Sequence, residues 1–183
     1  MIQSGTSAIQ HVVSVARLPQ NGMPVKLTAN DKELKLLAKA HDLVSVTSFS
    51  AELLVKKWRK DGVKITGTVK ASVVQSCIVT LEPINTVVEN EIDTLFVPEN
   101  SKLARPPLSA QGEIVVDYDG PDLPETFVGD TIDVGALAEE FFELGIDPYP
   151  RKKGASFDSN IEPEEVIEKK PSPFAKLVNF RRD

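Results

Sequence analysis

The sequence predicts an α+β fold, in which an antiparallel β-sheet is combined with two principal helices and followed by a flexible C-terminal tail. Apolar and polar residues alternate on both sides of a turn at residues 60–62, which indicates a hairpin from about Ser48 to Val74. Two other segments place apolar residues at helical spacing behind a capping residue. A polar, acidic stretch begins at Arg151, so we expect one domain over residues 1–150 and a tail over residues 151–183.

The first thirty residues predict a short hairpin. β-Branched residues between Ala8 and Leu18 indicate a strand, Asn21-Gly22 is a strong turn signal, and residues 24–28 suit a second strand. Pro24 places the start of that second strand near the edge of a sheet, because proline has no N–H to donate.

The two helices are predicted by their caps and their apolar faces. Asn30 followed by Glu33 has the spacing of a capping box for a helix that runs to about His41. Asp133 can cap a second helix over residues 134–144. The residues expected to face inward are Leu34, Leu37 and Ala38 in the first helix and Leu137, Phe141 and Leu144 in the second. Further strands are expected over residues 86–97 and 113–118.

Composition limits the classes of protein to consider. The chain has 183 residues, of which 41% are hydrophobic, and a net charge of −6, which are ordinary values for a globular protein. No apolar run is long enough to span a bilayer, and residues 1–10 lack the features of a secretory signal, so we expect a cytoplasmic protein with no membrane partner. One cysteine and two histidines argue against an internal disulfide and a zinc cluster, so we expect no metal and no cofactor.

Charge is distributed unevenly along the chain. Residues 1–81 carry 11 Lys and Arg against 5 Asp and Glu, whereas residues 82–183 carry 10 against 22. Such a split indicates one side that faces a polyanion and another that is acidic. The alternative is that the segments interleave in space and the charges only solvate both faces.

Basic residues gather around the predicted hairpin. Cations together with an aromatic side chain suit RNA, because cations attract phosphates and an exposed tryptophan stacks on an unpaired base. The alternative is a solvated face whose lysines discourage edge pairing, with Trp58 half-buried in the sheet. The candidate RNA-binding residues are Lys56, Lys57, Trp58, Arg59, Lys60, Lys64 and Lys70.

Catalysis has little support in the sequence. Cys77 lies in no catalytic Cys/His pattern, so we expect it to be buried and structural. No phosphate-binding glycine loop, serine elbow or HExxH pair occurs, so we expect no enzyme activity and no small-molecule substrate. A hydrolase built on an acidic loop is a distant alternative, although the spacing of that loop fits no calcium site. Its candidate residues would be Asp117, Asp119, Asp122, Asp130 and Asp133.

Three blocks of the chain together resemble a known family. The blocks are Gln75–Pro83 around the cysteine, Asp130–Gly135 at the entry to the second helix, and Asp147–Lys152 after it. In this order they resemble the YceD-like family of bacterial large-subunit ribosomal RNA accumulation proteins. The resemblance implies a cytoplasmic, non-enzymatic factor in the synthesis, processing or accumulation of large-subunit ribosomal RNA, acting during assembly of that subunit.

The chain departs from that family in the cysteine block. Many relatives carry the pattern Cys-x-Arg-Cys-Leu-x-Pro, whereas this chain keeps Cys77, Leu81 and Pro83 but has Val79 and Thr80 at the arginine and second cysteine positions. The departure removes any argument from paired thiols or a metal. What the block then implies is structural: Cys77 and Leu81 pack, and Pro83 fixes the bend.

The resemblance also implies a second way of acting. The block at the second helix resembles the acidic helix entry of the family, with Asp133 as the cap, and acidic surface complements basic ribosomal proteins. The alternative to direct binding of ribosomal RNA is therefore a protein adaptor or holding factor for a ribosomal protein. The candidate partner-binding residues are Glu139, Glu140 and Glu143 on the helix, with Phe174 and Leu177 of an apolar motif in the tail.

Overall fold

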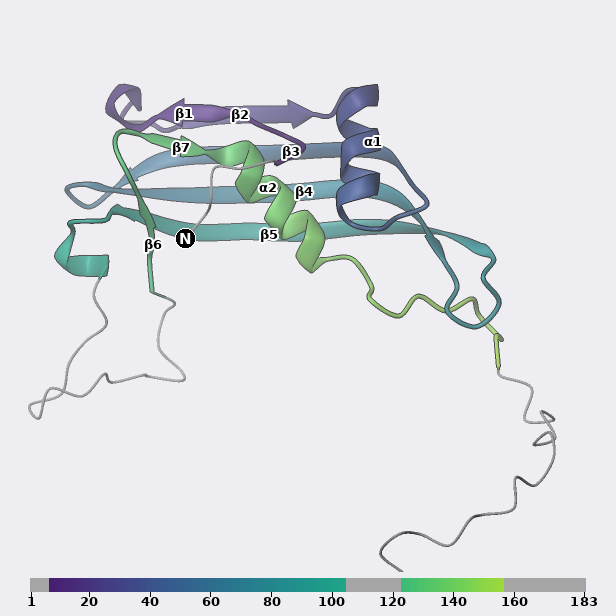
Figure 1. Cartoon of the computed structure of the whole chain (residues 1–183). Coiled ribbons are helices and arrows are strands. Elements are labelled where there is room, and N and C mark those ends of the chain that lie inside the picture. The colour runs from purple at the N-terminus through teal and green to yellow at the C-terminus, as the bar shows by residue number, and fades with distance from the viewer. Residues whose placement is uncertain (1–6, 105–122, 157–183) are drawn as a thin grey trace, which may run out of the picture. The chain divides into compact units, whose positions relative to one another are not determined.

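Figure 1 shows the computed structural model of the chain, which describes residues 7–104 and 123–156. The chain separates into two units, Met1–Lys152 and Lys153–Asp183, and every helix and strand described belongs to the first. These elements confirm the predicted α+β class. The predicted strand over residues 113–118 and the predicted tail from residue 157 onward lie outside the described residues. The domain boundary after residue 150 stays a prediction.

The main sheet has five strands in the order β2-β3-β4-β5-β6. Its strands are β2 (Met23–Thr28), β3 (Ser45–Trp58), β4 (Gly62–Ser76), β5 (Pro83–Pro98) and β6 (Glu125–Phe127). The predicted long hairpin is confirmed as β3 and β4, which pair antiparallel from Ser45 and Val74 to Trp58 and Gly62, with a register shift between Val46 and Ser48. Strand β6 is parallel to β5, so the sheet is mixed rather than purely antiparallel.

The predicted N-terminal hairpin is wrong. Strand β1 covers only Val12–Ser14 and is followed by the short 3₁₀ helix η1 (Val15–Arg17). It pairs with β7 (Thr131–Asp133), whereas β2 pairs with β3. The physical reason is that β3 offers β2 six paired residues, more than the three-residue β1 can offer. Strand β2 does lie at the edge of the sheet, as Pro24 predicted.

Two helices cover one face of the main sheet, as Figure 1 shows. Helix α1 (Asp31–Ala40) begins with the predicted capping box between Asn30 and Glu33. Helix α2 (Val134–Leu144) begins with the predicted cap, because Asp133 Oδ1 accepts hydrogen bonds from two backbone N–H groups of its first turn.

The buried face of α2 differs from the prediction at one residue. The face is centred on Ala138 and Phe142, so Leu144 at the end of the helix falls on its flank and is 72% exposed. The ring of Phe142 packs edge to face on Phe49 of β3 at 5.6 Å between centroids. The core therefore lies between the helices and one face of the sheet, while the opposite face carries charged side chains such as Lys70 and Glu89.

Candidate nucleic-acid interface

The end of the β3–β4 hairpin gathers four exposed cations. The last paired residues are Trp58 and Gly62, and the turn between them holds Arg59 in the left-handed region, with φ at 52°. Since neighbouring residues of a strand point to opposite faces, Lys56 and Lys57 place one cation on each side of the sheet. The cations that we call the hairpin tip are Lys56, Lys57, Arg59 and Lys60, and all are exposed.

Trp58 gives the hairpin tip a flat, half-buried surface. Its ring lies over Gly62, where an added Cβ would come 2.8 Å from a ring carbon. The guanidinium carbon of Arg59 lies 4.4 Å from the centroid of the ring. Arg59 and Gly62 therefore both lie against the ring of Trp58 at the end of the sheet.

The other two predicted RNA-binding lysines are engaged in ion pairs. Lys64 Nζ lies 2.9 Å from one carboxylate oxygen of Asp93 and 3.1 Å from the other. Lys70 Nζ lies 2.8 Å from Glu89 on the same strand, β5. Among residues 7–104 and 123–156, no ion pair involves a cation of the hairpin tip. The predicted basic surface is thus divided into a row balanced by β5 and a tip that is not.

The bend between β4 and β5 holds the cysteine block at the opposite end of the hairpin. Cys77 is fully buried, and its backbone N–H donates to the carbonyl of Glu82 at 2.8 Å. The backbone N–H of Ile78 donates to the carbonyl of Pro150 at 3.0 Å, which ties the bend to the segment after α2. Leu81 has a φ of 59° and is 78% exposed, so the expectation that it packs with Cys77 is wrong.

The sulfur of Cys77 accepts several hydrogen bonds. The backbone N–H of Lys152 lies 3.4 Å from Sγ, and the hydroxyl and N–H of Thr80 also donate to it. These donors lower the pKa of the thiol to about 6, from an ordinary value of 9.0. The buried thiol therefore links the bend to the segment after α2 through the N–H of Lys152.

The three predicted acidic residues of α2 have different surroundings. Glu139 is only 8% exposed, and its Oε2 accepts hydrogen bonds from Ser7 Oγ and from the backbone N–H groups of Ala8 and Ile9. His41 Nε2 lies 3.3 Å from its other oxygen. The expectation that Glu139 forms part of an acidic surface is therefore wrong.

Ser7, His41 and the N–H groups of Ala8 and Ile9 all contact Glu139. We call these groups, together with Glu139, the N-terminal clamp, because they hold residues 7–9 against α2. Burial by itself would raise the pKa of Glu139, but the hydrogen bonds from His41, Ser7, Ile9 and Ala8 outweigh burial and lower it. Ser7 and His41 were not identified from the sequence, because no local pattern joins them to a glutamate that lies 132 and 98 residues further along the chain, respectively.

The remaining candidate residues are distributed as follows. Glu140 and Glu143 are exposed on α2, and Asp133 serves as its cap. Phe174 and Leu177 lie outside the described residues, as do Asp117, Asp119 and Asp122 of the distant hydrolase hypothesis. Within the parts of the chain that are described, no group of three or more His, Cys, Asp or Glu side chains is arranged to hold a metal ion. In the same ranges, no helix is long and apolar enough to cross a membrane.

Fold and site together define a small α+β protein whose main sheet is covered by helices on one face. The β3–β4 hairpin ends in the cationic hairpin tip, and a cysteine-containing bend follows β4. Residues 65–181 match the family described as large ribosomal RNA subunit accumulation protein YceD. The match covers more than half of the chain, and the protein belongs to this family. The family name implies a role in the accumulation of large-subunit ribosomal RNA. Neither curated proteins nor solved structures gave a significant match.

Proposed function

We propose that this protein supports the accumulation of large-subunit ribosomal RNA by binding that RNA at the hairpin tip. The observation that carries the proposal is the set of four exposed cations beside Trp58, at the one end of the hairpin where the described acidic side chains of β5 do not balance the lysines. Because the whole protein has a net charge of −6, attraction to phosphate depends on a local concentration of positive charge.

The arrangement of the tip suits a single-stranded or looped RNA. Cations on both sides of the sheet reach successive phosphates of a strand that passes over its end. The stacked Arg59 and Trp58 present a planar surface on which an unpaired base stacks. The row that contains Lys64 and Lys70 suits RNA less, because binding there would break two ion pairs and bring phosphates close to carboxylates.

The test compares two variants that remove the same charge. One carries Lys56→Gln, Lys57→Gln, Arg59→Gln and Lys60→Gln, and the control replaces four exposed lysines elsewhere: Lys32, Lys35, Lys39 and Lys102. Fluorescence anisotropy with a labelled fragment of large-subunit ribosomal RNA is measured between 50 and 300 mM KCl. We expect the tip variant to lose at least about tenfold in affinity and to flatten the log–log salt slope by about 3. An equal loss in the control variant would mean that general charge, and not the tip, attracts RNA.

A second candidate function is a protein adaptor or holding factor for a ribosomal protein. The observation that favours it is the pair of exposed carboxylates on α2, Glu140 and Glu143. Acidic surface repels RNA but attracts the basic proteins that assemble on it. Copurification of ribosomal proteins after nuclease treatment distinguishes this function from RNA binding, because RNA no longer bridges the partners.

A further inference from the structure

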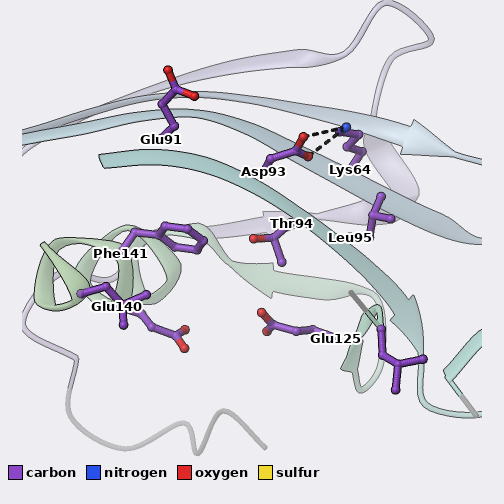
Figure 2. Close-up of a pocket in the computed structure, with 10 residues that line it drawn as sticks. Lys64, Glu91, Asp93, Thr94, Leu95, Glu125, Glu140 and Phe141 are labelled. Carbon is purple, nitrogen blue, oxygen red and sulfur yellow. Dashed lines mark hydrogen bonds and ion pairs between the residues drawn. The ribbon is translucent and has the colours of Figure 1, made fainter. Parts of the chain in front are cut away.

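A groove lies between the outer edge of β5 and helix α2, with a volume of about 630 Å³ (Figure 2). Its apolar lining includes Phe141 and Leu144 from α2, Leu95 from β5, and Leu123. Leu144 is 72% exposed and Leu123 is 55% exposed, so two large apolar side chains face solvent in one concave surface. Exposed apolar surface of this kind marks binding sites, because covering it releases water.

The rim of the groove is acidic. The carboxylates of Glu125 and Glu140 point toward one another across it, as Figure 2 shows. Burial and the nearby charge of Glu140 raise the pKa of Glu125, so the two negative charges repel each other. The lysine in the groove, Lys64, is already bonded to Asp93, so it does not relieve this repulsion. A positive charge brought in from outside would relieve it.

The groove also borders a sheet edge. Strand β6 pairs with β5 only at Phe96–Pro98. In the part of the chain that the structure describes, no strand pairs with β5 on that side before Phe96. Backbone groups along such an edge accept another strand, which is a common way of binding an extended peptide.

We propose that this groove binds an extended segment of another protein, in which basic and apolar residues alternate, as an added strand beside β5. Alternate residues of a strand point to opposite sides, so one set of side chains covers Phe141 and Leu144 on the helix side, while the other lies beside Glu91 and Asp93 on the opposite face of the sheet. A second copy of this chain fits poorly, because its β5 would bring Glu89, Glu91 and Asp93 to the same edge. The inference rests on the second candidate function, to which it gives a binding site and a class of partner.

The probe is a fluorescent eight-residue peptide that alternates lysine and valine, added to the full-length protein and followed by anisotropy. Glu140→Lys and Leu144→Ser alter exposed residues of the groove, and Glu99→Lys, which makes the same charge change at an exposed glutamate outside the groove lining, is the matched control. We expect each groove variant to weaken peptide binding at least about tenfold and the control to change it less than about twofold. A peptide of the same composition with four lysines followed by four valines should bind more weakly than the alternating one.

Three results would overturn the proposal. They are no binding of the alternating peptide, equal losses with Glu140→Lys and Glu99→Lys, and a dimer in sedimentation that Leu144→Ser dissociates, which would assign the groove to a second copy. Failure of the groove proposal is distinguished from failure of the adaptor function by testing whether ribosomal proteins copurify with the protein after nuclease treatment. If the groove variants still copurify with them, the adaptor function stands and the partner binds elsewhere.

Discussion

The N-terminal clamp and the acidic rim of the groove lie on different sides of the same helix and use the same kind of side chain. In the clamp, hydrogen-bond donors surround Glu139 and lower its pKa, although burial acts in the opposite direction. At the rim, Glu125 is partly buried beside Glu140, and its pKa is raised. The ionised form of Glu139 is therefore stabilised by its neighbours, whereas the ionised form of Glu125 is destabilised by burial and by the charge of Glu140.

The difference between the clamp and the rim indicates which carboxylates are available to bind a partner. A carboxylate whose hydrogen bonds are satisfied inside the protein contributes to folding and has little to offer a partner. A carboxylate that is partly buried next to another negative charge gains when a cation arrives. Glu139 and Glu140 are neighbours in the chain, yet the first belongs to the fold and the second to a surface that attracts positive charge.

Removing the buried carboxylate should have the largest effect on stability. Glu139→Ala leaves the backbone N–H groups of Ala8 and Ile9 without their acceptor. We expect a loss of about 3 kcal/mol in the free energy of unfolding, because buried donors then lack partners. Urea denaturation measures the loss, and Glu140→Ala, which should change stability by less than about 0.5 kcal/mol, is the control.

The same variant also tests whether the clamp is local. Amide hydrogen exchange should accelerate at residues 8–14 in Glu139→Ala well before it accelerates in β3 and β4, because the N-terminal segment detaches while the main sheet remains. If Glu139→Ala is as stable as the wild-type protein, the hydrogen bonds of the clamp contribute nothing to folding.

The clamp should also make stability depend on pH. Because the folded pKa of Glu139 lies below its ordinary value of 4.5, the unfolded chain takes up this proton first as the pH falls. The contribution of the carboxylate is therefore complete above about pH 5.5 and is lost as the pH falls through the folded pKa. We expect the difference in unfolding free energy between wild-type and Glu139→Gln proteins to be constant from pH 7 to 6 and to narrow below pH 4.5. A difference that stays the same down to the lowest pH of the folded state would contradict this.

Local patterns predicted the hairpin and the helix ends because their causes are local. The alternation in β3 and β4 lies within about thirty residues, and the caps of α1 and α2 are each set by an aspartate or asparagine within three residues of the N–H groups that they bind. The pairing of β1 with β7 joins segments about 120 residues apart, so no local pattern could reveal it.

The residues of the candidate site also separate into those that the local sequence identifies and those whose availability depends on distant parts of the chain. The cations of the hairpin tip are consecutive or nearly so, and the sequence was enough to identify them. Whether Lys64 and Lys70 are balanced depends on the register of β5, and whether Glu139 is exposed depends on Ser7 and His41. Charge in a sequence therefore identifies candidates for binding, and the neighbours brought by folding decide which of them are available.

The smallest effect expected is a gain in stability at the rim. A carboxyl whose folded pKa is raised stabilises the protein at low pH and loses that contribution as the pH rises through the folded pKa, so ionised Glu125 is unfavourable at pH 7. Glu125→Gln should therefore raise the free energy of unfolding by about 0.3 kcal/mol and Tm by about 1 °C, because the ionised carboxylate is only partly buried and the charge of Glu140 repels it weakly. Glu140→Gln should give a smaller gain, because it relieves the repulsion but not the burial of Glu125, and the double variant should add little to Glu125→Gln. Calorimetry at pH 7 and pH 4 measures all three variants. A loss of stability in Glu125→Gln, or a gain that persists at pH 4, would show that the two carboxylates do not repel each other, and the contrast with the clamp would then fail.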